Sequence, residues 1–129
     1  MTKISPMLAV PHGNRAIEFY KAAFGAKILW DLDGQIAGMS IDDAEFFLAE
    51  PSPGTRAPVS AGFTTVRIEL FVDDPVAVER RAVEAGATEH SPVEEHQHTT
   101  TGPRPIKRML QGAVLDPFGH MWLVGKILA

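Results

Sequence analysis

The sequence predicts an α+β fold built from two copies of a βαβββ module. Residues 4–27 and 65–88 share one pattern, in which an alternating strand ending in Val is followed by a polar turn, an amphipathic helix and Gly-Ala. The step from Val10 to Gly25 in the first copy is one residue longer than that from Val72 to Gly86 in the second. Three further strand candidates follow each helix. The repeat therefore sets the architecture before any single element is assigned.

Residues 1–51 form the first module and residues 65–129 the second module. The segment between them, residues 52–64, is rich in Pro, Gly and Ser and reads as a linker. Neither module could bury its sheet alone, so we expect one domain over residues 1–129. In that domain two curved mixed sheets are expected to form one open, barrel-like cleft.

The first helix is expected to begin near Asn14, which can accept hydrogen bonds from free backbone N–H groups. Ala16, Ile17, Tyr20 and Phe24 then recur at three- and four-residue intervals, which is typical of a helix side that faces the core. We interpret these aromatic residues as core rather than as a cofactor site.

The second helix has stronger boundary signals. Asp73 or Asp74 can cap its start, Pro75 suits the first helical position and Gly86 suits a left-handed stop. Its buried side is expected to carry Val76, Ala82 and Val83.

The strands after each helix are separated by turn residues. Asp33-Gly34 and Asp42-Asp43 predict tight hairpins in the first module. In the second module, "QHTTTGPRP" at 97–105 predicts a long mobile loop, of which residues 99–102 could close over a bound ligand.

Composition excludes several classes of function. The chain has no cysteine, so it has no disulfide and no thiolate site. A net charge of −4 argues against nucleic acid as a partner, and no apolar run is long enough for a membrane span. The first residues reach a proline and then polar residues too soon for a secretory signal, so a cytoplasmic location is expected.

Three motifs point to a known family. The segments "VPHGNRAIEFYKAAFGA", "VDDPVAVERRAVEAGA" and "DPFGHMWL" resemble the vicinal oxygen chelate superfamily of glyoxalases, bleomycin-resistance proteins and extradiol dioxygenases. Within it, "AIEFYKAAFGA" and "DPFGHMW" look most like the bacterial branch labelled demethylubiquinone-methyltransferase-like. The resemblance implies the paired-module fold and a homodimer. No Gly-rich loop for adenosylmethionine supports the methyltransferase part of that label.

The resemblance also implies where a metal would bind. In metal-using members the first and last strands of each module supply ligands, and these positions match Ser5 and Arg67 on the first strands. The last-strand positions match Leu123 and the neighbourhood of Phe47, with Glu50 the one carboxylate near them. These residue types do not make a metal site, so we predict no bound metal and no cofactor.

The positions of the histidines indicate whether each has a structural role or could bind a metal. His120 lies an odd number of residues from Leu123, so it points away from the cleft and is predicted to have a structural role in its turn. His96 and His98 are two residues apart, so in an extended segment both side chains lie on one face, with His90 nearby. A metal ion bound by this pair is the less favoured interpretation.

The predicted ligand-binding residues come from the cleft faces of the outer strands. Arg67 offers a guanidinium fork for a carboxylate or phosphate, and Glu69 is the candidate catalytic residue because it could accept a proton or hold Arg67 in place. An internal pair between Arg67 and Glu69 is the plain structural alternative. The remaining predicted lining residues are Ser5, Met7, Phe71, Met121 and Leu123.

Three functions are left open by these residues. The first is a metal-free protein that binds a small molecule, similar to the drug-sequestering members of the superfamily. The second is an enzyme of the same scaffold, either a metal-dependent lyase, isomerase or dioxygenase or an acid/base catalyst that uses Glu69. The third is a structural or regulatory domain.

Overall fold

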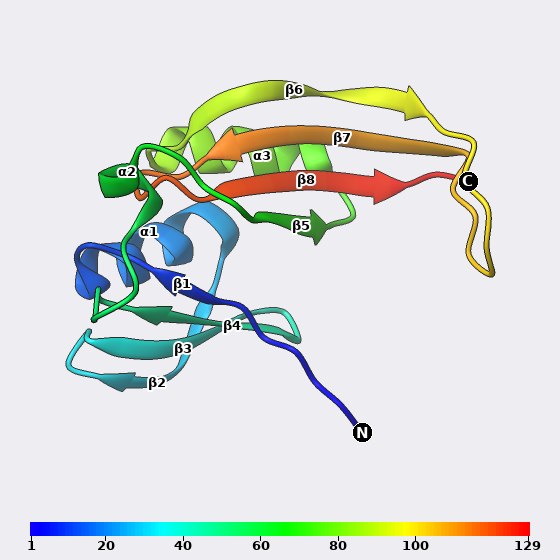
Figure 1. Cartoon of the computed structure of the whole chain (residues 1–129). Coiled ribbons are helices and arrows are strands. Elements are labelled where there is room, and N and C mark those ends of the chain that lie inside the picture. Colours follow the sequence, from blue (N-terminus) through cyan, green and yellow to red (C-terminus); the bar gives the residue numbers. More distant parts are fainter.

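The computed structural model describes residues 1–129 and contains two four-stranded sheets (Figure 1). The first module folds into the sheet β1-β4-β3-β2, in which β1 and β4 are parallel and the other neighbours are antiparallel. Its elements are β1 (Met7–Ala9), α1 (Gly13–Phe24), β2 (Lys27–Leu32), β3 (Ile36–Ile41) and β4 (Ala44–Ala49).

The second module repeats this topology as β5-β8-β7-β6, again with one parallel pair, β5 and β8. Its elements are β5 (Arg67–Phe71), α3 (Pro75–Ala85), β6 (Thr88–Gln97), β7 (Arg108–Leu115) and β8 (Met121–Ile127). The predicted linker contains one short helix, α2 (Pro58–Ala61). The predicted α+β fold of two βαβββ modules is thus confirmed, with sheets that curve without closing into a barrel.

The hairpin predictions are also confirmed. Asp33 and Gly34 have φ angles of 50° and 75° in the turn between β2 and β3, and Asp42 has a φ of 50° between β3 and β4. Two central residues with positive φ match the right-handed twist of the strands that they join. The Asp33-Gly34 turn therefore sets the pairing of β2 with β3 next to the hairpin.

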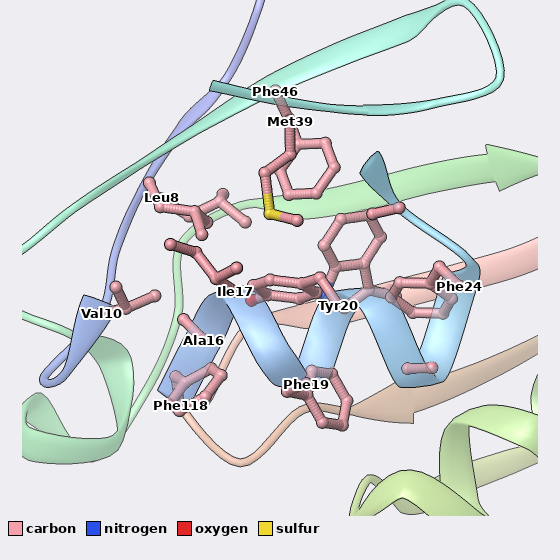
Figure 2. Close-up of a cluster of buried hydrophobic side chains, with 14 of the residues drawn as sticks. Leu8, Val10, Ala16, Ile17, Phe19, Tyr20, Phe24, Met39, Phe46 and Phe118 are labelled. Atoms are coloured by element: carbon pink, nitrogen blue, oxygen red, sulfur yellow. The ribbon is translucent and has the colours of Figure 1, made fainter. Parts of the chain in front are cut away.

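Helix α1 lies between the two sheets. The fully buried Tyr20 ring lies with its centroid 5.4 Å from that of Phe46 in β4 and 5.5 Å from that of Trp122 in β8. Figure 2 shows Ile17 and Tyr20 on the helix side that faces Met39 and Phe46. One buried hydrophobic cluster consequently contains residues of both modules, as expected if neither sheet can be covered by its own module.

The start of α1 differs from the prediction. The helix begins at Gly13 after His12, and no side chain from its own first turn caps it. The Gly13 N–H instead donates to Glu50 Oε2 at 2.9 Å, so a carboxylate at the end of β4 binds the helix N-terminus. Asn14 was the wrong cap because the capping group comes from a strand distant in sequence.

The buried side of α3 also differs in part. Asp74 caps the helix by accepting from the Ala77 N–H at 3.2 Å, and Ala82 is fully buried, both as predicted. Val76 and Val83 are 47% and 39% exposed, whereas Glu79 is only 8% exposed. The helix side that packs on the sheet runs through Pro75, Glu79 and Ala82 at helical spacing, which turns the two valines outward.

Candidate ligand-binding groove

The open face of the second sheet carries the predicted charged pair. In β5, Leu70 is buried against the helices, while Arg67, Glu69 and Phe71 lie on the opposite face and are exposed. Strand β8 runs parallel beside β5 and places Leu123 next to Glu69. Alternation along each strand therefore separates the apolar core residues from this open face.

A groove of about 460 Å³ lies on this face. Strands β5, β8 and β7 form its floor, and the loop between β6 and β7 forms one side. The groove is lined by Arg67, Glu69, His98, Thr100, Ile106, Met109, Gln111 and Leu123.

The two charged side chains of the groove do not pair with each other. The three ion pairs in the structure join other residues, and Arg67 takes part in none of them. Glu69 instead accepts a hydrogen bond through Oε1 from Gln111 Nε2. The internal Arg67–Glu69 pair, which was the structural alternative, is therefore not formed, and the guanidinium is available to a ligand.

A glycine lets Gln111 reach Glu69. Strand β8 lies between β5 and β7, and Gly125 is the β8 residue in register with both Phe71 and Gln111. A Cβ at Gly125 would lie 2.6 Å from the Leu110 carbonyl oxygen, closer than side chains come. Because no side chain stands at this position, the amide of Gln111 can cross the middle strand.

The loop beside the groove is held closed by its own hydrogen bonds. The His98 N–H donates to the Lys107 carbonyl at 2.8 Å, and the Ile106 N–H donates to Thr100 Oγ1 at 2.6 Å. These bonds extend the β6–β7 hairpin and bring three loop side chains to the groove wall, those of His98, Thr100 and Ile106.

The other predicted lining residues lie elsewhere. Met7 lines a groove of about 540 Å³ between β1, the linker and β5, and Met121 lines one of about 440 Å³ near α2. Ser5 is half-buried just before β1, and Phe71 is exposed at the end of β5. Within one chain, the structure thus brings together Arg67, Glu69 and Leu123 of the predicted set.

The groove residues contributed by β7 and by the loop between β6 and β7 were not predicted from the sequence. Strand alternation in "RMLQGAVL" could have placed Met109 and Gln111 on one face. The sequence predicted a loop that could close over a ligand, but not that the side chains of His98, Thr100 and Ile106 would line the same groove as Arg67, because that contact depends on how the loop folds.

The residues at the superfamily's metal positions do not fit a metal. In the second module, Arg67 and Leu123 occupy those positions, and a guanidinium and an alkyl chain offer no ligand. In the first module, Met7 pairs with Phe47, and Ser5 precedes them. Glu50 is used at the start of α1. Nowhere in the structure do three or more histidine, aspartate or glutamate side chains converge.

The turn before β8 joins the two modules. Asp116, only 4% exposed, accepts hydrogen bonds from the Phe118 and His120 N–H groups at 2.9 and 3.0 Å. Trp122 Nε1 at 3.0 Å and the Tyr20 hydroxyl also donate to it. Burial, and then the charge of Asp116, raise the pKa of Tyr20 well above its usual value. A buried carboxylate thus binds a helix of one module and a turn of the other.

His120 acts in the same junction. Its side chain is 9% exposed, and Nε2 donates to the Ala9 carbonyl of β1 at 2.7 Å. This agrees with the structural role predicted for His120, but its side chain contacts the other module and not only its own turn. The side chain also forms part of the wall of the groove next to β1.

Comparison with known proteins identifies the class to which this fold belongs. Residues 4–124 match the family model of the Glyoxalase/Bleomycin resistance protein/Dioxygenase superfamily, and the chain belongs to that superfamily. None of the helices has the length and apolar run that crossing a membrane requires.

One relative found by sequence and two solved structures are similar to this chain over nearly its whole length. The chain is 35% identical to the uncharacterized protein Mb0911c of Mycobacterium bovis over 133 residues, covering 95% of this chain and 82% of that protein. The structure of a gene product from Arabidopsis thaliana is 26% identical, with a TM-score of 0.71 over 98% of this chain and 99% of that one. TioX from Micromonospora sp. ML1 is 18% identical, with a TM-score of 0.69 over 99% and 98% of the two chains. At that identity, the likeness to TioX shows the fold alone.

Proposed function

We propose that this protein binds a small anionic molecule in the groove of the second sheet, without a metal to hold it. The observation that supports this proposal is the Arg67 guanidinium, which has no ionic partner and lines a groove of mixed polar and apolar side chains. A guanidinium fork binds carboxylate or phosphate through two parallel hydrogen bonds. Apolar side chains, those of Ile106, Met109 and Leu123, can take up the rest of the ligand.

Glu69 has a second role in this proposal. Its carboxylate is oriented by Gln111 and lines the same groove as Arg67. It would accept a hydrogen bond from the ligand, and it is the residue that would take a proton if the bound molecule reacts.

Two of the remaining predicted lining residues, Ser5 and Met7, enter the proposal through a homodimer. The open face of the first module is apolar, with Met7 56% and Trp30 45% exposed, and the Trp30 ring lies tilted against Phe47 with the ring centroids 5.5 Å apart. A second copy that covers this apolar face would remove it from water. If its second module provides the cover, Ser5 and Met7 of one chain meet Arg67 of the other. Light scattering of the purified protein measures the oligomeric state, and a monomer at all concentrations contradicts the dimer.

The test of the binding site uses a change at Arg67. We expect Arg67→Ala to weaken the binding of an anionic ligand by about tenfold to a hundredfold, the cost of losing a hydrogen bond to a charged group. A thermal-shift screen of small carboxylates, phosphates and phosphonates first finds the ligand, and calorimetric titration then gives the affinities. Arg80→Ala is the control, because Arg80 is exposed on α3 and lies outside the groove. Equal affinities in wild type and Arg67→Ala would remove Arg67 from the site.

The cytoplasmic location and the single domain over residues 1–129 remain parts of this proposal. Cell fractionation tests the first. A single cooperative unfolding transition, seen alike by tryptophan fluorescence and by circular dichroism, tests the second.

A further inference from the structure

We propose that the ligand of this groove carries an α-amino acid group, with its carboxylate on Arg67 and its ammonium on Glu69. This inference rests on the proposed function, because it assumes that Arg67 binds an anion. It goes further by naming the class of ligand, a zwitterion with an apolar side chain.

The spacing of the two charges fits a zwitterion. Arg67 and Glu69 are two residues apart on one face of β5, so their Cα atoms are separated by about 6.6 Å. The carboxylate and ammonium of an amino acid are attached to one carbon. An amino acid lying along the strand can therefore contact both protein side chains at once.

The second argument for a zwitterion concerns the ion pairs that Arg67 and Glu69 do not form. Arg67 and Glu69 do not form an ion pair with each other, and neither takes part in any other ion pair of the structure. A simple anion that binds Arg67 would bring its negative charge toward the Glu69 carboxylate, which opposes binding. A zwitterion offers each charge its opposite, so electrostatic complementarity favours it over an anion or a cation of the same shape.

Gln111 prepares Glu69 for a donor. The amide nitrogen binds Oε1 of Glu69, and no other hydrogen bond to that carboxylate is present in the structure. An ionised carboxylate can accept about four hydrogen bonds, so Oε2 remains free for an ammonium group. The gap left by Gly125 keeps this amide in reach, and the carboxylate is held in place before the ligand arrives.

The groove walls indicate the side chain of the ligand. Leu123 lies next to Glu69 in the sheet, and Met109 and Ile106 line the same groove. A branched or aromatic apolar side chain would bury its surface against these three residues. A free amino acid, or the end of a larger molecule that carries such a group, has the chemistry required.

The experiment compares three probes of one shape in calorimetric titrations of the full chain. L-leucine carries both charges, 4-methylpentanoate lacks the ammonium group, and 3-methylbutylamine lacks the carboxylate. We expect leucine to bind at least about tenfold more tightly than either of the others, the size of one hydrogen bond to a charged group.

Two variants locate the charges. Glu69→Gln keeps the shape of the side chain and removes its charge, so it should weaken leucine by about tenfold and leave 4-methylpentanoate unchanged or tighter. Arg67→Met should weaken both probes. Arg80→Ala is again the control, and unchanged melting temperatures confirm that the exposed substitutions leave the fold intact.

The outcomes separate this inference from the proposed function. If 4-methylpentanoate or another simple anion binds as tightly as leucine and depends on Arg67, or if leucine does not bind while such an anion does, the amino acid inference is wrong and the anion site stands. If leucine and every anion fail to bind, or bind without any dependence on Arg67, both proposals are wrong.

Discussion

The first strands of the two modules occupy the same place in one topology but carry different chemistry. Ser5 and Met7 stand before Val10 where Arg67 and Glu69 stand before Val72. On the core side the strands agree, because Leu8 and Leu70 are both buried. The fold therefore constrains the inward residues of each strand, and the outward residues of one module can differ in chemistry without a change to the core.

The open faces differ for a second reason. In the first module, Trp30 lies over Gly38, where its indole nitrogen comes within 2.4 Å of the point that a Cβ would occupy, and its ring packs at a tilt against Phe47. In the second module, the face carries Gln111 and the two charged residues of β5. Aromatic side chains thus fill the first face, whereas the second retains a groove.

The junction between the modules gives the largest expected effect. Asp116→Ala should lower the free energy of unfolding by about 4 kcal/mol, because four donors would lose a buried charged acceptor. Urea denaturation measures the change. Asp73→Ala is the control, since Asp73 is exposed and caps no helix. A loss no larger than that of the control would show that the modules associate without this carboxylate.

Tyr20 tests the same junction from the side of the first module. Tyr20→Phe should cost about 2 kcal/mol, the size of a hydrogen bond to a charged group. Because its folded-state pKa is raised, the contribution of Tyr20 is full below the unfolded pKa of about 10 and is lost as pH rises above it. It is the only tyrosine, so tyrosinate absorbance reports this residue alone. Tyrosinate that forms at its ordinary pKa in folded protein would contradict the burial argument.

Helix α3 contains a residue whose replacement should stabilise the protein. Glu79 Oε2 is buried without a hydrogen-bond partner, and burial, followed by the charge of Glu89, raises the pKa of Glu79. Such a group disfavours folding when ionised, so stability falls as pH rises through its raised pKa. Glu79→Met should raise the free energy of unfolding at neutral pH by about 1 kcal/mol and weaken this pH dependence. Glu84→Met, at an exposed position of α3, serves as the comparison.

A chelator should have the smallest effect. Neither module presents a set of metal ligands at the superfamily's positions, so incubation with EDTA should leave the melting temperature unchanged. Elemental analysis of protein purified without a tag accompanies this measurement. Stoichiometric metal together with a lower melting temperature after chelation would show that ligands lie at positions not considered above.

The turns, helix start and strand face that depend on local sequence signals were predicted. Asp33-Gly34 and Asp74-Pro75 set a turn and a helix start through their own backbone and side chains, and period-two alternation placed Arg67 and Glu69 on an open face. The start of α1 could not be predicted, since its carboxylate comes from Glu50. Nor could the buried side of α3, because hydrophobicity favours burial of Val76 and Val83 over Glu79, and only the packing against the sheet turns Glu79 inward.

The site residues on β5 could be predicted from the sequence, but those on β7 and in the loop could not. The pair on β5 follows from alternation alone. The partner of Glu69 does not, because Gln111 is 42 residues away in sequence and reaches across a middle strand through the space at Gly125. The other groove residues depend on a loop whose shape is set by its own hydrogen bonds.

The position of α1 between both sheets bears on how such a chain could have arisen. Its aromatic side contacts Phe46 of one module and Trp122 of the other, so a single module would leave part of that side in water. An isolated module would have to find a second one by diffusion. Joining two modules by a short linker makes the encounter intramolecular, at an effective concentration in the millimolar range. The linker thus makes assembly of the core independent of how much protein the cell contains.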